Sequence, residues 1–282
     1  MHSSTVNIIG AGRVGQTIAR LLQGKDGYIL QDVLNARMQS AQDFVELIGQ
    51  GRAVDNFAEL RAADVWMLTV PDTQIHRVAE QIAKAYSASP TPSVALHCSG
   101  FFPADQMAPL RSLNWRLASV HPVLSFADPL TAARQFNGVL CGVEGDPEAT
   151  EVATTMFEAL GAKCFPIKSE GKSLYHAAAV ISNNFTVVLQ AIAREAWDAA
   201  GVPDDVAQQL KETLLRGTCD NVCAQGPKAA LTGPAARGDD FVVETQGRDV
   251  GDWHPVAGRI YSDLSALAKS LSKSGKTRSA GD

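Results

Sequence analysis

The sequence predicts an α/β protein in which a doubly wound parallel sheet is followed by an all-helical C-terminal half. Up to residue 169, short apolar runs alternate with helical patterns, which is the order of repeated βαβ units. From residue 170 onward only helical patterns follow, and the length of 282 residues suits two domains. We therefore expect a first domain over residues 1–169, a helical domain over residues 170–271 and a disordered polar tail over residues 272–282.

The first half alternates candidate strands with candidate helices. Residues 64–70 (DVWMLTV) form an uninterrupted apolar run, typical of a central parallel strand covered on both faces. The other strands are expected at residues 6–9, 28–34, 93–97, 116–121, 138–143 and 163–167. Apolar residues at helical spacing predict helices over residues 15–23, 41–48, 73–86 and 147–160.

The second half is predicted to be helical throughout. Residues 173–200 contain neither Pro nor Gly and form one long helical stretch, which Gly201 and Pro203 end. Three further helices are expected over residues 205–223, 237–245 and 255–271.

The composition excludes several classes of protein. Apolar residues make up 45% and charged residues 20%, with a mean hydropathy of -0.04, as in soluble globular proteins. The net charge of -5 argues against a dominant nucleic-acid role. No apolar run reaches the roughly 18 residues of a membrane span. The five cysteines form no CxxC pair, and no signal-type leader is seen, so we expect a reducing, cytoplasmic setting.

A glycine-rich turn follows the first strand and opens the first helix. It consists of Gly10, Ala11, Gly12, Arg13, Val14 and Gly15. In this GxGxxG pattern the first glycine permits the tight turn, the second lets a pyrophosphate approach the backbone, and the third lets helix and strand pack closely. The helix N-terminus adds free N–H groups for the phosphates. The position of the motif between strand and helix predicts dinucleotide binding in a Rossmann-type domain.

The choice of cofactor depends on the end of the second strand. An acidic residue there would bind the ribose 2′-hydroxyl of NAD. Asn35 stands about 20 residues after the turn, and Arg37 follows it, a combination that suits the 2′-phosphate of NADP. Arg13 adds positive charge within the turn. We therefore predict NADP(H) rather than NAD(H), although a shift of register would place Asp32 at the ribose and reverse the preference.

Other polar or turn-forming residues stand where later strands end, which is where ligands bind in such sheets. Val70 and Pro71 stand at the end of the strand expected at residues 64–70 and are expected near the nicotinamide-side ribose. Ser99 follows the strand expected at residues 93–97, His121 ends the strand expected at residues 116–121, and both are candidates for the active site. Structural turns are the alternative at each position.

The long helix opens with a polar stripe. His176, Val180 and Asn183 recur at intervals of four and three and so share one helix face. A histidine and an asparagine on a face of small apolar residues would be costly if simply buried, which suggests that they line a cleft. A satisfied core histidine is the alternative.

The motifs together resemble the 6-phosphogluconate dehydrogenase-like superfamily. The resemblance rests on the glycine turn, on TVPD (69–72), HCSG (97–100) and the His-Pro pair at 121–122, and on the all-helical second half. Within it, YHAAA (175–179) and TGPAARGD (232–239) are similar to a subgroup of Rossmann-like proteins whose C-terminal half is known only as a domain of unknown function. The resemblance covers about residues 6–271 and implies relationship to pyrroline-5-carboxylate reductase, β-hydroxyacid dehydrogenases, prephenate dehydrogenase and deazaflavin-dependent NADP reductases.

One departure from the superfamily changes the expected chemistry. β-Hydroxyacid dehydrogenases carry a catalytic lysine three residues before an asparagine pair, and here that position holds Val180. Their lysine mechanism is therefore not carried over, and His176, one turn earlier, is the nearest side chain that can handle a proton. Arg237 is a candidate for binding a substrate anion, unless it forms a structural salt bridge with Asp239.

These residues predict an NADP(H)-dependent oxidoreductase that acts on a small carbonyl, imine or hydroxy-acid substrate held between the two domains. His176, or otherwise His121, would transfer a proton. Asn183 and Ser99 would orient the substrate, and Arg237 would hold an anionic group. The alternatives are an NADP-binding sensor or assembly module without catalysis, and a structural protein with an empty cleft.

The long helical stretch also bears on assembly. Residues 173–200 carry more apolar residues than one small domain needs, so we expect a homodimer formed through the helical domain. We expect no nucleic-acid or membrane partner and no metal site, and we expect Cys219 and Cys223 to pack in the core.

Overall fold

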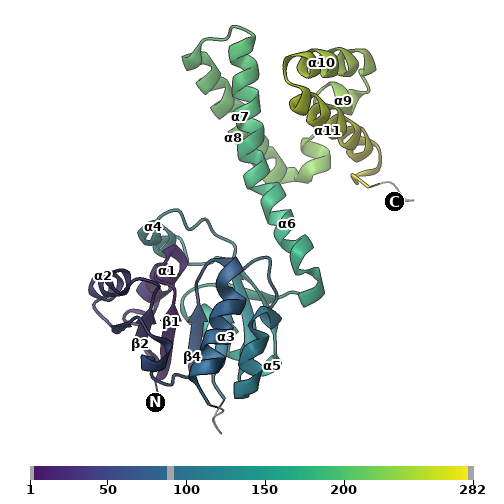
Figure 1. Ribbon diagram of the computed structural model, residues 1–282. Coiled ribbons are helices and arrows are strands. Elements are labelled where there is room, and N and C mark those ends of the chain that lie inside the picture. Colours follow the sequence, from purple (N-terminus) through teal and green to yellow (C-terminus); the bar gives the residue numbers. More distant parts are fainter. Residues whose placement is uncertain (1–2, 88–91, 279–282) are drawn as a thin grey trace. The chain divides into compact units, whose positions relative to one another are not determined.

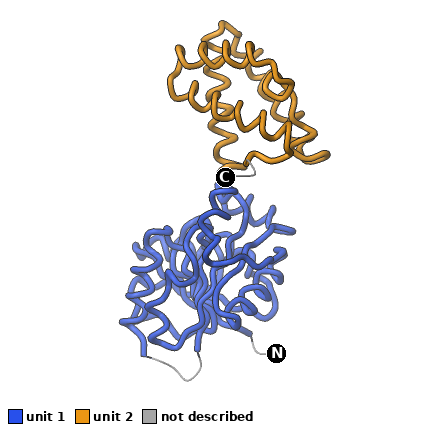
Figure 2. The backbone as a smooth tube through the Cα atoms, turned by 90° about the vertical axis from the view of Figure 1, so that its right-hand side faces the viewer, with its two compact units in different colours: residues 1–180 blue, residues 181–282 orange. Residues whose placement is uncertain are grey.

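The computed structural model describes residues 3–87 and 92–278. The chain divides into two compact units, Met1–Val180 and Ile181–Asp282, which are coloured separately in Figure 2. The division falls at residue 180, whereas the sequence pattern changes at residue 169. The difference arises because the first turns of the long helical stretch pack on the first unit.

Within the described residues, the first unit contains one eight-stranded sheet in the order β3-β2-β1-β4-β5-β6-β7-β8. The strands are β1 (Ser4–Ile9), β2 (Tyr28–Leu34), β3 (Arg52–Val54), β4 (Val65–Leu68), β5 (Val94–His97), β6 (Arg116–Pro122), β7 (Leu140–Gly145) and β8 (Lys163–Pro166). The predicted doubly wound α/β class is confirmed. One detail of the prediction is wrong, because β7 runs antiparallel to β6, with Ser119 opposite Glu144.

The helices of the first unit flank this sheet (Figure 1). They are α1 (Arg13–Leu22), α2 (Met38–Ile48), α3 (Ile75–Ala85), α4 (Pro129–Arg134), α5 (Pro147–Ala159) and α6 (Lys172–Ser182), with 3₁₀ turns η1 (Phe57–Glu59), η2 (Asp72–Gln74), η3 (Ala104–Leu113) and η4 (Ser169–Gly171). The prediction missed β3 and α4 because they are short. It missed η3 because Pro109 interrupts any helical pattern there.

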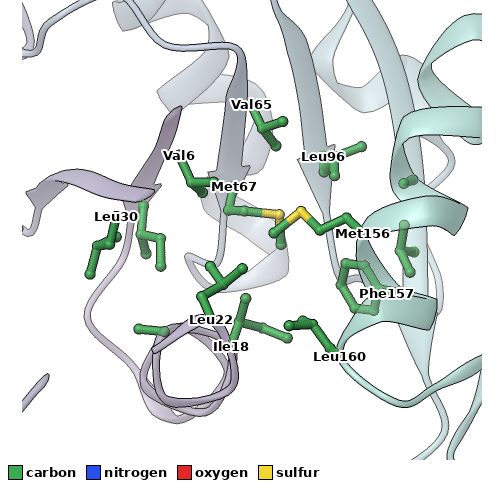
Figure 3. Close-up of a cluster of buried hydrophobic side chains, with 14 of the residues drawn as sticks. Val6, Ile18, Leu22, Leu30, Val65, Met67, Leu96, Met156, Phe157 and Leu160 are labelled. Carbon is green, nitrogen blue, oxygen red and sulfur yellow. The ribbon is translucent and has the colours of Figure 1, made fainter. Parts of the chain in front are cut away.

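Two hydrophobic layers cover the two faces of the sheet. Successive side chains of β4 alternate between them: Val65 and Met67 face the layer formed with α1, α2 and α5, while Trp66 and Leu68 face the layer formed with α3 and η3. Figure 3 shows the first layer, in which Met67 of the sheet and Met156 of α5 point toward one another. The continuous apolar run predicted for this strand is explained by burial on both faces.

The second unit consists of helices. They are α7 (Asn184–Ala199), α8 (Asp204–Ala230), α9 (Pro234–Arg237), α10 (Asp240–Trp253) and α11 (Pro255–Ser274). The single long helix predicted over residues 173–200 is interrupted at Asn183, which separates α6 from α7. The helix predicted over residues 237–245 is broken at Gly238, whose φ is +80°.

The predicted polar tail is partly helical. Residues 272–274 belong to α11, and the hydroxyl of Ser272 donates a hydrogen bond to the carbonyl oxygen of Ala236 (3.0 Å). Residues 279–282, also part of that prediction, lie outside the described residues.

The second unit leaves most of its large apolar side chains exposed. Its fully buried residues, among those described, are Ala207, Val243, Ala257 and Gly258. By length and composition, one helical run, Ser169–Ala199, is apolar enough to cross a membrane, and none of its most apolar window is buried. Contiguous exposed apolar surface on a helix is typical of interaction sites.

Candidate functional site: a dinucleotide cleft and a histidine pair

A cavity of about 800 Å³ lies at the carboxyl ends of β1, β2 and β4. Six of the predicted cofactor residues line it, namely Gly10, Ala11, Gly12, Asn35, Val70 and Pro71. The other four predicted cofactor residues, Arg13, Val14, Gly15 and Arg37, are not among its lining residues. The cavity therefore occupies the place at which dinucleotides bind in sheets of this class.

The glycine turn is shaped by close packing on Thr69, which the sequence analysis did not single out. Gly10 has a φ of +110°, and a Cβ atom there would lie 2.7 Å from the backbone of Thr69. A Cβ at Gly15 would lie 2.7 Å from Oγ1 of Thr69. That hydroxyl donates a hydrogen bond to the carbonyl oxygen of Gly10 (2.8 Å). Gly10 and Gly15 are thus required by the fold itself.

Gly12 differs from the other two glycines. A Cβ atom there would meet only the carbonyl oxygen of Thr69, at 3.9 Å, and the residue is the N-cap of α1 with extended backbone. Neither packing nor conformation requires a glycine at this position. Its missing side chain leaves the first N–H groups of α1 open toward the cavity, as a pyrophosphate needs.

The end of β2 shows where the register places Asp32. Asp32 lies within the strand, is fully buried and forms ion pairs with Arg52 (3.0 Å) and Arg61 (2.6 Å). Burial by itself would raise the pKa of Asp32, but the hydrogen bonds from Arg61 and Arg52 outweigh it and hold the pKa below its usual value. Asp32 is therefore a structural carboxylate, and the register that would place it at a ribose is wrong.

Asn35 is the residue that follows the strand, as predicted. Its Oδ1 accepts a hydrogen bond from the backbone N–H of Ala11 (3.4 Å), which ties the end of β2 to the glycine turn. Arg37 is the N-cap residue of α2 and its side chain is exposed. No hydrogen bond or ion pair of its guanidinium is found among the described residues, so this group is free to bind a ligand.

The hydroxyl of Ser99 is hydrogen-bonded within its own turn and to η2. It donates to Oδ2 of Asp72 (2.6 Å) and accepts hydrogen bonds from the backbone N–H groups of Phe101 (3.2 Å) and Phe102 (3.0 Å). One donor and two acceptor sites are all that a serine hydroxyl has. The structure therefore favours the structural-turn alternative, in which Ser99 joins the end of β5 to η2.

His121 and His176, both predicted as candidates, lie beside one another. Their rings meet edge to face with centroids 5.7 Å apart. Nδ1 of His121 is hydrogen-bonded to the hydroxyl of Tyr175 (3.0 Å). A Cβ atom at Gly100 would lie 2.7 Å from Nε2 of His121 and would also clash with the ring of His176. Gly100 therefore provides the space in which the two rings meet.

The electrostatics of His121 favour the neutral ring. Burial, and then the charges of His176 and Lys172, lower its pKa to about 4, against a weaker opposing effect of Asp72. The hydrogen bond with the Tyr175 hydroxyl engages Nδ1 and leaves Nε2, which faces Gly100, as the second polar atom of the ring. A neutral imidazole has one N–H donor and one acceptor nitrogen, so His121 can hydrogen-bond a ligand at neutral pH.

The helix face predicted from His176, Val180 and Asn183 is only partly formed. Asn183 stands at the break between α6 and α7, in the second unit, so the stripe does not continue through it. The helix face that forms instead contains Lys172, Tyr175 and His176, which stand at positions i, i+3 and i+4 of α6. The sequence contained this signal, because positions i, i+3 and i+4 of a helix lie on one face.

Arg237 also lies in the second unit. Its Nε donates a hydrogen bond to Oδ2 of Asp239 (3.0 Å), which is the structural salt bridge given as the alternative to anion binding. Both side chains remain largely exposed.

The cysteines take no part in this site. Burial raises the pKa of Cys98 to about 12, so its thiol is protonated and unreactive. Cys219 and Cys223 are exposed on α8, and the expectation that they pack in the core is wrong. Among the described residues, no group of three or more His, Cys, Asp or Glu side chains is placed to hold a metal ion.

Two protein families match the chain. The family described as "Rossmann-like domain" matches residues 2–122, and the family described as "Domain of unknown function (DUF2520)" matches residues 139–268. No curated protein matches the sequence.

Solved structures share the fold. Protein TM1727 from Thermotoga maritima is 26% identical, with a TM-score of 0.74 over 96% of this chain and 99% of that chain. An imine reductase from Myxococcus stipitatus, in complex with NADP+, is 14% identical, with a TM-score of 0.66 over 97% and 96%. A pyrroline-5-carboxylate reductase from Coxiella burnetii is 19% identical, with a TM-score of 0.57 over 97% and 100%. The chain thus joins a region that matches the Rossmann-like domain family to a region that matches the DUF2520 family, in a fold consistent with the 6-phosphogluconate dehydrogenase-like superfamily.

Proposed function

We propose that the protein is an NADP(H)-dependent oxidoreductase that acts on a small carbonyl, imine or hydroxy-acid substrate. The observation that carries the proposal is the glycine turn, in which Gly12 leaves the N-terminus of α1 open to a cavity of about 800 Å³ although nothing in the fold requires a glycine there. The reductase names of two fold neighbours, one of them solved with NADP+, support the same class.

The residues present fit a nicotinamide dinucleotide. The backbone N–H groups of the turn would bind its pyrophosphate, while Asn35 and the free guanidinium of Arg37 would bind the adenosine ribose and its 2′-phosphate. Val70 and Pro71 would border the nicotinamide-side ribose. When bound, the cofactor supplies the hydride chemistry, and the chain supplies orientation and proton transfer.

Proton handling is assigned to the histidine pair. His176 is half-buried on α6 and stands against His121, which is held by Tyr175. In our proposal His176 exchanges a proton with the substrate oxygen or nitrogen, and neutral His121 orients the substrate by hydrogen bonding. The anion-binding role of Arg237 and the substrate contact of Asn183 remain parts of the proposal that concern the second unit.

Titration of the protein with NADPH and with NADH, followed by nucleotide fluorescence, tests the proposal. We expect both to bind, with NADPH the tighter ligand. His176→Ala should lower kcat and leave the affinity for NADPH unchanged. Binding of neither nucleotide would refute the proposal, and equal losses of turnover and affinity in His176→Ala would instead indicate a structural histidine.

A non-catalytic NADP-binding sensor is the second candidate, and one observation favours it. Val180 stands where β-hydroxyacid dehydrogenases have their catalytic lysine. This candidate predicts that NADPH binds tightly to both the wild type and His176→Ala. It also predicts that neither protein turns over carbonyl acids, imines or hydroxy acids.

We also propose that the chain works as a homodimer in the cytoplasm, with the second unit as the interface. Large side chains are exposed on several of its helices, including Val187 (66%), Leu214 (56%) and Phe241 (80%). A unit that buries so few residues needs a partner surface, and a second copy of the chain is the common solution. The charged Arg194 and Glu195 on α7 argue against a lipid environment.

Light scattering at micromolar concentration tests the assembly. We expect twice the monomer mass, and Val187→Glu should shift the distribution toward monomer because it places a carboxylate in the interface. Val123→Glu, at a 45% exposed valine of the first unit, is the matched control. A strict monomer, or dissociation by both variants alike, would refute the interface.

A further inference from the structure

Lys172, the first residue of α6, is a buried lysine that the proposed chemistry does not use. Its side chain is 1% exposed, and its Nζ donates hydrogen bonds to Oγ of Ser119 and to Oε1 of Glu144 (3.4 Å). Burial lowers the pKa of Lys172 to about 8, an effect that the Glu144 carboxylate partly opposes. A cation is seldom buried to this degree unless it is paired, and this one is paired.

Glu144 connects the lysine to several segments of the chain. Its side chain is 3% exposed. Oε1 accepts a hydrogen bond from the backbone N–H of Ala104 (2.8 Å) and Oε2 accepts one from the hydroxyl of Ser169 (2.6 Å). Ser119 in turn donates to the carbonyl oxygen of Ser99 (3.3 Å). The cluster thus joins β6, β7, the start of η3, η4 and the start of α6.

Such a cluster is a poor source of stability alone. The desolvation of two buried charges largely cancels their attraction, and apolar side chains of similar volume often stabilise a fold as well. Its directed hydrogen bonds, however, define an orientation that apolar contacts would leave less well determined.

The strand register shows what the cluster orients. Ser119 pairs with Glu144 across β6 and β7, and His121 pairs with Gly142 two residues further along. Residues two apart in a strand share a face, as do residues three and four apart in a helix. The face of α6 that contains Lys172, Tyr175 and His176 therefore lies along one face of the β6–β7 pair.

The contacts follow this register one by one. Lys172 donates hydrogen bonds to Ser119 and Glu144. Tyr175 is hydrogen-bonded to His121 and packs against Gly142, where a Cβ atom would lie 2.8 Å from the tyrosine hydroxyl. The next residue of α6, His176, meets the ring of His121.

We propose that Lys172, held by Glu144 and Ser119, is a positioning residue that fixes the first turns of α6 so that Tyr175 and His176 stand against His121. The inference deepens the proposed function, because it assigns to that site the group that holds its proton-transfer geometry. Lys172 itself is buried and touches neither substrate nor cofactor in this scheme.

Lys172 also acts on His121 through its charge. The groups that act on His121 are His176, Lys172 and Tyr175 from α6 and Asp72 from η2, and the Lys172 cation is one of those that lower the pKa of His121. Lys172 itself is acted on by Glu144, Cys98 and Asp72. Removal of the cation should therefore move the pKa of His121 from about 4 toward its ordinary value of about 6.5.

The test compares Lys172→Met with the double variant Lys172→Met/Glu144→Gln, which leaves no unpaired buried charge and so protects the fold. Lys168→Met, at an exposed lysine four residues earlier, is the matched control for charge. NMR titration of the His121 imidazole and the nuclear Overhauser effect between His121 and Tyr175 report position without any substrate. NADPH affinity and kcat are measured beside them.

We expect the Lys172 variants to lose the His121–Tyr175 effect, to raise the pKa of His121, and to reduce kcat on the order of 10-fold to 100-fold with unchanged NADPH affinity. Lys168→Met should match the wild type. A folded double variant that keeps the His121–Tyr175 effect and the wild-type kcat would overturn the proposal. If the wild type does not bind NADPH or turn over substrate, the proposed function fails, while the NMR comparison still decides the positioning role.

Discussion

The glycine turn allows a prediction in which two neighbouring glycines behave in opposite ways. In Gly10→Ala the new Cβ would lie 2.7 Å from the backbone of Thr69, at a φ of +110° that L-residues avoid. The backbone conformation costs about 1–2 kcal/mol and the overpacking about 1–3 kcal/mol. In Gly12→Ala the Cβ meets only one atom at 3.9 Å, with φ −78°, so the loss is at most about 1 kcal/mol, the cost of alanine at an N-cap.

Calorimetry and nucleotide fluorescence separate the two effects. A destabilisation of about 3 kcal/mol should lower the Tm of Gly10→Ala by about 6–12 °C, and that of Gly12→Ala by no more than about 4 °C. Gly12→Ala should nevertheless weaken NADPH binding at least about 10-fold, or about 1.4 kcal/mol, because its methyl group stands where the pyrophosphate approaches the helix N-terminus. Wild-type affinity in Gly12→Ala would refute the assignment of this turn to a dinucleotide, and a Tm loss equal to that of Gly10→Ala would refute the packing argument.

Three further variants test separate parts of the site. Arg37→Ala should weaken NADPH binding about 10-fold or more and leave NADH binding unchanged, since the guanidinium would bind only the 2′-phosphate; equal effects on both nucleotides in fluorescence titrations would contradict this. Asp32→Asn should destabilise the fold by about 1–3 kcal/mol, a value reduced because Arg52 and Arg61 are half exposed. Because the folded pKa of Asp32 is depressed, the wild-type advantage is present above the unfolded pKa of about 3.9 and is lost as the pH falls through the lower folded value, so urea midpoints of the two proteins should converge in acid. Tyr175→Phe, which removes the hydroxyl bonded to His121, should lower kcat roughly 10-fold with unchanged NADPH affinity, and an unchanged kcat would show that the hydrogen bond does not orient His121.

The strands and helices near the glycine turn were predictable because local patterns determine them. The prediction for β2 matches the strand from Tyr28 to Leu34, and the apolar run of β4 was expected from burial on both faces. The antiparallel direction of β7 was not predictable, because a short apolar strand has the same composition whether it pairs parallel or antiparallel with its neighbour.

The residues of the candidate site were likewise predictable from the sequence only in part. The residues of the cofactor turn follow from spacing, whereas the saturated hydroxyl of Ser99 depends on Asp72, which is 27 residues distant in the chain. The contact between His121 and His176 likewise joins residues far apart in sequence. The contact requires the space that a side chain at residue 100 would fill, which the glycine leaves open.

The sequence by itself determined the class of fold, the position of the dinucleotide turn and the identity of the two histidines, because each follows from periodicity or from residue types at fixed local spacing. Tertiary structure alone decided that Asp32 is a buried ion-pair partner, that the hydroxyl of Ser99 is bonded to Asp72 and that Lys172 is joined to Glu144. Those outcomes depend on which strands become neighbours and in which register, and a one-residue shift of pairing would turn every side chain concerned to the opposite face of the sheet.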